Sequence, residues 1–320
     1  MITTPTVLVL GAGASAAYGF NTGWELLQQA RAFTVDTVAG YIQPISKTVA
    51  PALHDALLNT GELSIDAMLE SETRPEVVKA GKALMARFLL RSEAHALQRN
   101  HAFPREWYRV LFGALSAPTE KEALAQPFTV VTFNYDRSLE RCLAQAWRVK
   151  YHHDRPVDPD ALSAKFIHVH GQLGALLETG GAGTQLPYGG GEDGITDADV
   201  LEASQGIKVI HEANTDDPKF VAARKALTLA GQQGRVVFLG FAFAQRNFER
   251  LQLSEHMPNN GSTVYVSAFG FSENGMRLRI PVPATSLASV SVAAARTKLT
   301  RDALLGLLSL LKECAAPCPD

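Results

Sequence analysis

Short runs of consecutive apolar residues recur along the chain, each bounded by glycine, proline or polar residues. Such runs predict strands buried on both faces, as in a parallel sheet that helices cover on either side. We therefore expect an α/β fold, with a further and weaker strand signal within Ser286–Val292. The clearer strands are expected at Val7–Leu10, Phe128–Phe133, Phe166–Val169, Lys208–His211, Val236–Leu239 and Val264–Ser267.

Helical spacing replaces the strand pattern between the first two of these strands. Pro75–Gln98 and Pro104–Leu115 each begin with a proline, which suits a first helical turn, and carry apolar residues at helical spacing. We interpret residues 34–126 as a mostly helical insertion subdomain. Residues 1–33 and 127–320 then form one discontinuous Rossmann-like domain, with a parallel sheet and helices on both faces.

Two later segments have a distinct composition. The glycine-rich segment Gly180–Gly194 predicts a loop. It lacks the Gly-Lys-Ser/Thr ending of a nucleotide-triphosphate loop, so we assign it no phosphate role. Thr300–Leu311 has leucines on most sides, which predicts a helix that packs against the domain, with a subunit contact as the alternative.

Composition and charge narrow the class of protein. The 320 residues, 46% of them hydrophobic, suffice for two domains or for one large α/β domain with an insertion. The net charge of −2 shows no basic excess, so direct binding to nucleic acid or to an anionic membrane is not expected. Without a signal peptide or an apolar run of about 18 residues, a cytoplasmic protein is expected. Three cysteines are too few for a disulfide framework or a four-thiolate zinc site.

The first candidate for chemistry is the glycine motif in VLVLGAGAS. A strand ends at Gly11, Ala12 and Gly13, and a helix is expected to follow. Glycine permits the tight turn and lets main-chain N–H groups approach a diphosphate, to which a helix N-terminus adds partial positive charge. An ordinary tight turn is the alternative. A dehydrogenase would also need an acidic residue about 20 positions on. Asp36 could serve, but it follows a helical pattern, so we do not favour that interpretation.

The second candidate lies in VVTFNYDRSLE, where a strand ends in an amide and a carboxylate. Ligands of open α/β sheets bind outside the carboxyl ends of the strands, where Asn134 and Asp136 are expected. An amide can donate and accept hydrogen bonds, which suits sugar hydroxyls or a water. Either residue could instead cap the helix that begins near Arg137.

The third candidate is KFIHVHGQLG. Strand alternation predicts that His168 and His170 lie on one face of the strand and Val169 on the other. His170, at the strand end, is the better general base, because histidine exchanges protons near neutral pH. We interpret His168 as structural. A metal held by both histidines is possible but has no evident third ligand.

The fourth candidate is VVFLGFAFAQRNFERL. Its strand ends at Gly240, which permits a ligand to approach closely. Asn247 follows and is suited either to cap a helix or to bind a ribose. Taken alone, this stretch indicates little about function.

Together these stretches resemble the sirtuin-like, or silent-information-regulator-like, family. GAGAS is similar to that family's Gly-Ala-Gly-hydrophobic-Ser loop, TFNYD to its Thr-Gln-Asn-Ile-Asp strand end, and HVHG to its catalytic His-Gly. LGFAFAQRN resembles its late glycine strand with a downstream asparagine. SIDAMLE, Ser64–Glu70, resembles a helical-insert segment of the bacterial branch. The motifs occur in the family's order from about Val7 to Phe269, so the resemblance covers most of the chain.

The resemblance implies that NAD binds on the Rossmann-like domain and is the substrate. Asn134 would hold the ribose or a water, and Asp136 would lie near the nicotinamide carboxamide. His170 would act as the base on a ribose hydroxyl or on the water. The residues implied to bind the rest of the dinucleotide are Gly11, Ala12, Gly13 and Ser15 at the diphosphate, with Gly240 and Asn247 near the adenosine half.

Two departures from the family pattern refine this expectation. Tyr135 replaces the usual aliphatic residue, which bears on the nicotinamide side. Deacetylating sirtuins carry a four-cysteine zinc module after His-Gly, whereas this chain has the cysteine-free loop Gly180–Gly194 there. The resemblance therefore implies the zinc-free bacterial antiphage branch, which destroys NAD rather than deacylating protein, and no metal is expected.

The resulting hypothesis is an NAD glycohydrolase that yields nicotinamide and ADP-ribose and is held inactive until triggered. The alternatives are a non-catalytic NAD- or ADP-ribose-binding subunit and a zinc-free deacylase or ADP-ribosyltransferase. An uncontrolled NAD hydrolase would kill its host. Homo-oligomerisation or a partner, such as a nucleic-acid-acting ATPase or a sensor, is therefore expected. The helical insertion is placed to lid the site, to mediate assembly or to complete the core.

Overall fold

A parallel sheet forms the centre of the computed structural model. The structure describes residues 1–98, 107–151, 157–176, 185–191, 194–209, 216–241, 245–256, 263–267 and 291–293. Six strands pair in the order β3-β2-β1-β6-β7-β8, and every pairing is parallel. These strands are β1 (Thr6–Leu10), β2 (Phe128–Thr132), β3 (Phe166–His168), β6 (Arg235–Leu239), β7 (Thr263–Ser267) and β8 (Ser291–Ala293).

The strand order places β1 at a topological switch point. The chain moves outward from β1 through β2 to β3, then returns to the other side of β1 and continues through β6, β7 and β8. This is the strand order of a Rossmann fold. Strands β4 (Ala175–Leu176) and β5 (Gln185–Leu186) form a small separate sheet. Leu10 pairs with both Thr132 and Leu239, so the three central strands end level with one another. The predicted α/β Rossmann-like fold is confirmed.

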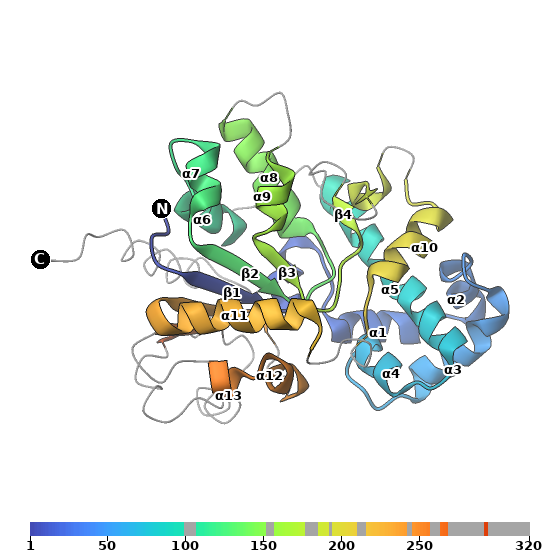
Figure 1. Cartoon of the computed structure of the whole chain (residues 1–320). Helices are drawn as coiled ribbons and strands as arrows, with labels where there is room; N and C mark the ends of the chain where they lie inside the picture. Colours follow the sequence, from blue (N-terminus) through green and yellow to red (C-terminus); the bar gives the residue numbers. More distant parts are fainter. Residues whose placement is uncertain are drawn as a thin grey trace, which may run out of the picture.

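Apolar side chains on both faces of the sheet hold two layers of helices. One cluster joins Leu8 and Leu10 to the helices above the sheet in Figure 1, and another joins Val7 and Val9 to α11 below it. All five residues of β1 are buried, which explains its uninterrupted apolar run. The helices of the first layer are α6 (Trp107–Ala114), α7 (Glu120–Ala125), α8 (Ser138–Lys150) and α9 (Pro159–Ser163). Those of the second are α11 (Pro218–Gln233), α12 (Gln245–Leu251) and α13 (Leu253–His256).

A lobe of helices lies beyond the carboxyl ends of the strands (Figure 1). We call it the helical lobe. It consists of α1 (Gly23–Arg31), α2 (Val35–Tyr41), α3 (Ala50–Asn59), α4 (Ile65–Ser71), α5 (Pro75–Gln98) and α10 (Asp197–Gly206). Their apolar side chains form one cluster, which also contains Leu173, Leu176 and Leu186. Short 3-10 helices connect the elements: η1 (Ala12–Ala14), η2 (Ala16–Tyr18), η3 (Lys47–Val49) and η5 (Tyr188–Gly190).

The helix prediction for Pro75–Gln98 is confirmed over its whole length, and α6 covers the described part of Pro104–Leu115 except Leu115. One strand prediction is wrong. Lys208 and Val209 belong to no strand, because the chain leaves α10 through a single bridge between Gly171 and Ile207. The rest of that segment, the helix predicted at Thr300–Leu311, part of the strand predicted within Ser286–Val292 and residues 180–184 and 192–193 of the predicted Gly180–Gly194 loop lie outside the described residues. In its described part, that loop contains the short strand β5 and the 3-10 helix η5.

The predicted domain boundaries stay a prediction, but the apolar clusters cross them. The cluster of the helical lobe begins at Phe20 and takes in α1 and α10, which lie outside residues 34–126. Trp107 and Leu111, which lie inside those residues, pack instead with the strands and with α8. Core packing thus divides the chain between sheet and lobe rather than at positions 33 and 126.

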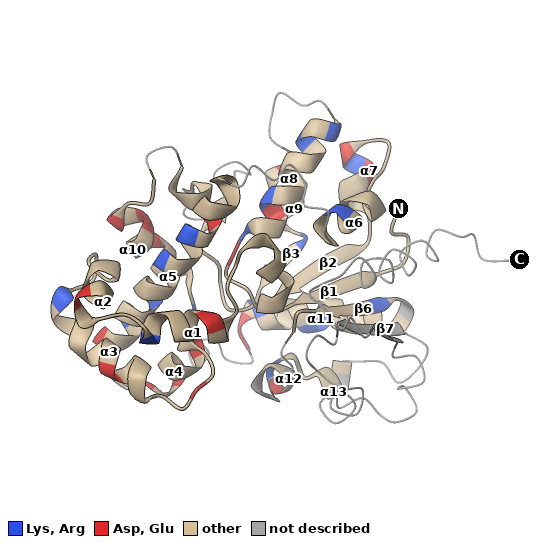
Figure 2. Ribbon diagram, turned by 180° about the vertical axis from the view of Figure 1, so that it is seen from behind, with Lys and Arg blue, Asp and Glu red and all other residues tan. Residues whose placement is uncertain are grey.

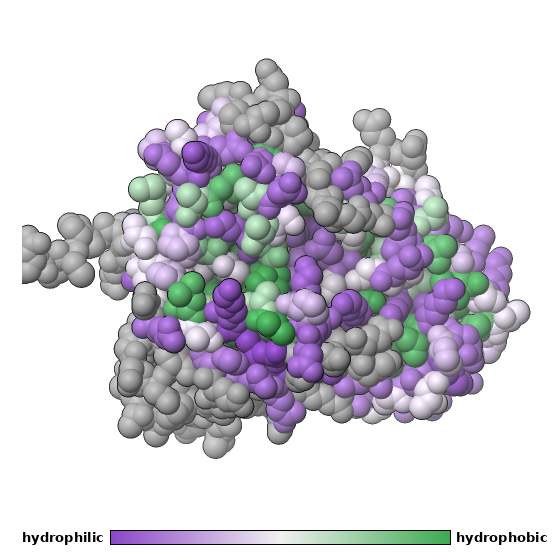
Figure 3. Space-filling view, viewed as in Figure 1, coloured by the Kyte–Doolittle hydropathy of each residue, from purple (hydrophilic) through white to green (hydrophobic). Residues whose placement is uncertain are grey.

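The described surface is mixed in charge and in polarity. Lys and Arg are interspersed with Asp and Glu over the helices in Figure 2. Figure 3 shows a mainly hydrophilic face with small apolar areas, one of them over α11, where Val221 and Leu229 are exposed. Exposed apolar side chains in small groups are normal on a folded chain. Among the described helices, none is both long and apolar enough to cross a bilayer.

Candidate functional site

Two glycine turns interlock at the switch point of the sheet. The Gly11 N–H donates to the Leu239 carbonyl at 3.0 Å, and the Gly13 N–H donates to the Gly240 carbonyl at 3.1 Å. Gly240 has a φ of +57°, and a Cβ there would lie 2.0 Å from the Ala14 nitrogen. The turn after β1 and the turn after β6 therefore approach so closely that side chains are excluded between them.

This contact corrects two expectations about the glycine motif. The amides of Gly11 and Gly13 are taken up by carbonyls of the β6 turn, rather than turned toward a ligand. No α-helix follows directly either, because η1 and η2 intervene before α1 begins at Gly23. The diphosphate role of Gly11, Ala12 and Gly13 stays a prediction.

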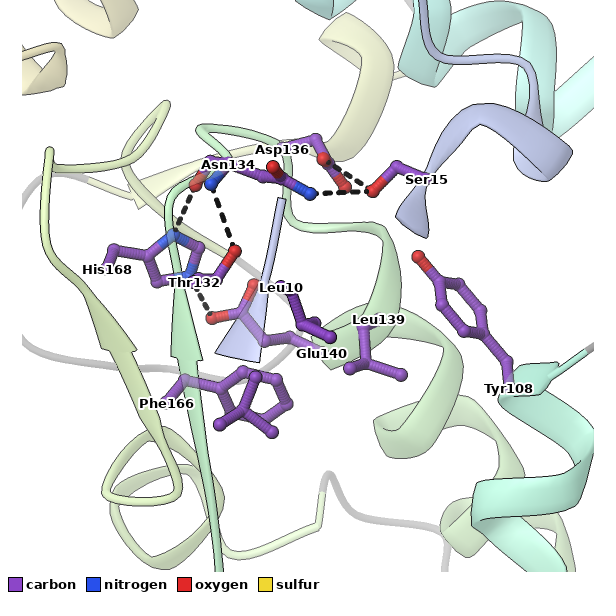
Figure 4. A pocket seen from close by; sticks show the side chains of 11 residues that line it. Leu10, Ser15, Tyr108, Thr132, Asn134, Asp136, Leu139, Glu140, Phe166 and His168 are labelled. Atoms are coloured by element: carbon purple, nitrogen blue, oxygen red, sulfur yellow. Dashed lines mark hydrogen bonds and ion pairs between the residues drawn. The ribbon is translucent and has the colours of Figure 1, made fainter. Parts of the chain in front are cut away.

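Side chains from the β1 and β2 ends meet in a buried hydrogen-bond network (Figure 4). The Asn134 amide donates to the Gly11 carbonyl at 3.0 Å and to Ser15 Oγ at 3.2 Å. Ser15 Oγ donates to Asp136 Oδ2 at 2.8 Å. Because Nδ2 must be the donor to a carbonyl, the network fixes the orientation of the amide. Its Oδ1 accepts no hydrogen bond from the described residues, so it can accept one from a ligand or a water.

Asp136 is not the N-cap of α8, which is Arg137, but its carboxylate accepts from a donor in the first turn of that helix. Its Oδ1 accepts from the Ser138 N–H at 3.1 Å in the first turn of α8, and from the Ser138 hydroxyl. Tyr108 of α6 continues the network with a 2.6 Å hydrogen bond between its hydroxyl and Ser138 Oγ. Burial raises the pKa of Asp136, whereas the hydrogen bonds from Ser138 and Ser15 oppose that rise.

His170 lies on the other side of the sheet from His168, which makes the predicted alternation wrong. Strand β3 ends at His168, and the Gly171 N–H donates back to the His168 carbonyl, so the chain turns there. The His170 ring consequently packs edge-on against Phe133, with centroids 5.4 Å apart, and against Phe220 of α11 at 5.6 Å.

The imidazole of His170 is neutral, and one of its ring nitrogens, Nδ1, makes no hydrogen bond to the described residues. Burial, together with the nearby Arg250 cation, lowers its pKa to about 4, and an amide contact from Asn247 opposes this. His170 is 4% exposed, and its buried Nδ1 has no hydrogen-bond partner among the described residues. Unpaired buried polar atoms are uncommon and often mark functional positions. The fold thus brings Asn247 to His170.

His168 is held on the opposite face by two acceptors (Figure 4). Its Nδ1 lies 3.0 Å from the main-chain oxygen of Asn134, and its Nε2 lies 2.9 Å from Glu140 Oε1 of α8. The residues between His168, Asp136 and Tyr108 enclose a space of only ≈ 10 Å³. That is about the room that one water needs, so this network has no space for a larger ligand.

An ion pair that the sequence analysis missed fastens the helical lobe to the site. Arg137 and Glu93 of α5 are both 0% exposed and form two hydrogen bonds, at 3.1 and 2.7 Å. The guanidinium also donates to the Leu186 carbonyl at 2.8 Å. A signal existed: Glu93 follows Leu89 by four positions and so falls on the core-facing stripe of α5.

The predicted site residues therefore form two groups. Ser15 forms hydrogen bonds with both Asn134 and Asp136, and Asn247 lies beside His170, but no hydrogen bond among the described residues joins the two groups. Across the residues that the structure describes, no group of three or more His, Cys, Asp or Glu is placed to hold a metal ion. In comparisons with known proteins, no family model and no curated protein matches the chain.

Proposed function

We propose that the chain is an NAD⁺ glycohydrolase that cleaves the nicotinamide–ribose bond to give nicotinamide and ADP-ribose. One observation carries the proposal. At the carboxyl ends of neighbouring strands β2 and β3 lie an oriented Asn134 amide and a neutral His170 imidazole whose Nδ1 has no hydrogen-bond partner among the described residues. Open α/β sheets bind dinucleotides outside the carboxyl ends of their strands, next to the switch point.

The chemistry asks little of the protein. As the bond from nicotinamide to the ribose C1′ breaks, its electrons return to the cationic ring nitrogen, so the leaving group departs neutral and needs no acid. The site must orient the ribose, stabilise the developing positive charge and admit a water. The water oxygen bonds to C1′, and one of its protons leaves to a base.

Asn134 and His170 supply those functions in the proposal. Asn134 Oδ1, left as an acceptor by the two hydrogen bonds of its Nδ2, orients the ribose or the water. His170 accepts the proton, and its low pKa keeps the ring in the acceptor form at neutral pH. Asp136 holds Ser15 and the first turn of α8 beside them.

The test follows NAD and its products by chromatography, with purified wild-type, Asn134→Ala and His170→Ala proteins. His95→Ala and Asn59→Ala, at exposed positions of the helical lobe, are the matched controls. The wild type and both controls should release nicotinamide and ADP-ribose. We expect Asn134→Ala and His170→Ala to lose about 100-fold or more in kcat/KM while remaining folded. Full turnover in either would refute the assignment.

A non-catalytic NAD- or ADP-ribose-binding subunit is the second candidate. The observation in its favour is that Ser15 joins Asn134 to Asp136 without a ligand, and that Asp136 accepts from the Ser138 N–H in the first turn of α8. Tight NAD binding without turnover in any oligomeric state would support it. Acyl-ADP-ribose or a modified protein among the products would indicate a deacylase or ADP-ribosyltransferase, and reduced cofactor a dehydrogenase.

The proposal extends to biological role. We propose a cytoplasmic effector of bacterial antiphage defence that depletes NAD when triggered. Its control would come from homo-oligomerisation or from a partner, such as a nucleic-acid-acting ATPase or a sensor. Light scattering with and without NAD, run beside the cleavage assay, tests whether assembly and turnover change together.

A further inference from the structure

The environment of His168 calls for two ring protons. Nδ1 faces a main-chain carbonyl, and Nε2 faces a carboxylate, so both neighbours are acceptors. A neutral imidazole carries one N–H and would leave one of these contacts as an oxygen facing a lone pair. The ring is 3% exposed and both contacts are direct, so bulk water does not supply the missing donor.

His168 also determines where Asn134 lies. The ring contacts the main-chain oxygen of Asn134, and the Asn134 N–H donates to Thr132 Oγ1 at 3.0 Å. Both contacts hold the backbone of the residue whose side-chain amide reaches Gly11 and Ser15 (Figure 4). Moving a positioned group by about 1 Å can lower a rate about 100-fold.

We propose that His168 is a positioning residue: an imidazolium, paired with Glu140, that fixes the Asn134 backbone and thereby its side-chain amide. The inference deepens the proposed function, on which its catalytic consequence rests. Deprotonation of His168 would release the Asn134 carbonyl, so site geometry depends on pH.

The charged groups around His168 favour its protonated form. Burial alone would lower the pKa of His168, but the Glu140 carboxylate and the Asn134 carbonyl hold it above its usual 6.5, and Asp136 adds to the rise. Besides Glu140 of α8 and Asp136 of the turn after β2, Tyr108 of α6 lines the same space. Burial raises the pKa of Tyr108 well above its usual value, which keeps that ring neutral. The imidazolium is therefore present below its raised pKa and is lost as the pH rises through it.

The first arm of the test needs no turnover. The full chain, labelled with ¹⁵N, is titrated by NMR, with the ring resonances of His168 assigned by His168→Gln. We expect a doubly protonated ring at pH 7 and a transition at higher pH, with the Asn134 side-chain NH₂ resonances moving at the same midpoint. Glu140→Gln should shift both midpoints to lower pH. A singly protonated ring at pH 7, or Asn134 resonances that ignore the transition, would overturn the proposal.

The second arm measures NAD cleavage against pH. In wild type and in Asp160→Asn, a control at an exposed position of α9, the rate of cleavage should fall at the same alkaline pH. In Glu140→Gln, the fall in rate should begin at a lower pH, whereas the maximal rate on the acid side should stay within a few-fold of that of the wild type. His168→Gln should lower kcat about 100-fold with a much smaller change in KM. A fall at the same pH in wild type and Glu140→Gln would count against the inference. No cleavage by any protein would refute the proposed function alone, because the NMR arm still decides the role of His168.

Discussion

The buried pair of Glu93 and Arg137 should dominate the stability of the contact between the helical lobe and the sheet. In Glu93→Gln, the carboxamide keeps the shape of the side chain but loses the charge. Three donors now converge on the carboxylate, namely Arg137 Nε, Arg137 Nη2 and the Gly189 N–H. A glutamine has only one oxygen, so its NH₂ group must face at least one of these donors.

The magnitude follows from the burial of both partners. Both side chains are 0% exposed, so the guanidinium that remains cannot turn to water. Removing one partner of such a pair costs about 3–5 kcal/mol, against a total stability of about 5–15 kcal/mol for a typical domain. Replacing Arg137 by Met as well should restore only part of the lost free energy of unfolding, because the carbonyls of Ala175 and Leu186 lose their donor. Each such loss costs about 1–3 kcal/mol.

Urea unfolding followed by tryptophan fluorescence gives the free energy of unfolding for wild type, Glu93→Gln, Arg137→Met and the double variant. Glu72→Gln is the control, because Glu72 pairs with the half-exposed Arg74 and should change stability far less. If Glu93→Gln loses less than about 1 kcal/mol, the buried pair does not fasten the lobe to the sheet.

Two further predictions concern the switch point and His170. Gly240→Ala should cost at least about 2 kcal/mol, because alanine is strained at a φ of +57° and its Cβ would meet the Ala14 nitrogen; Gly40→Ala, which has nothing within 4 Å, should be neutral or stabilising in the same urea assay. The depressed pKa of His170, about 4 against 6.5, means that the unfolded chain binds its proton more readily. Its stabilisation of about 3 kcal/mol should therefore be present above pH 6.5 and lost as the pH falls toward 4. His170→Phe should remove that part of the pH dependence in thermal unfolding, and an unchanged slope would contradict the prediction.

The elements most accurately predicted are those whose signal is local. The apolar runs of β1 and β6 and the stripe of α5 require only their own residues, and the structure has them where the sequence predicts. The level ends of parallel strands likewise made it possible to expect Asn134 beside the turn after β1. The face of His170 could not be derived in that way, because it depends on where β3 ends, and the turn at Gly171 depends on its distant bridge to Ile207.

The partners of charged residues were beyond the sequence because burial, not residue type, decides them. Glu93 and Arg137 are 44 positions apart, and in the sequence each resembles an ordinary surface charge. Only the packing of the lobe on the sheet buries both. Their pairing bears on the helical insertion, for which lid, assembly and core roles were all open. A lid that swings on α5 would have to separate two buried charges, and it would leave Arg137, the residue next to Asp136, without its carboxylate partner. A motion of that kind would disturb the very network it was meant to cover. The described contacts therefore favour a lobe that completes the core and stays fixed on the sheet.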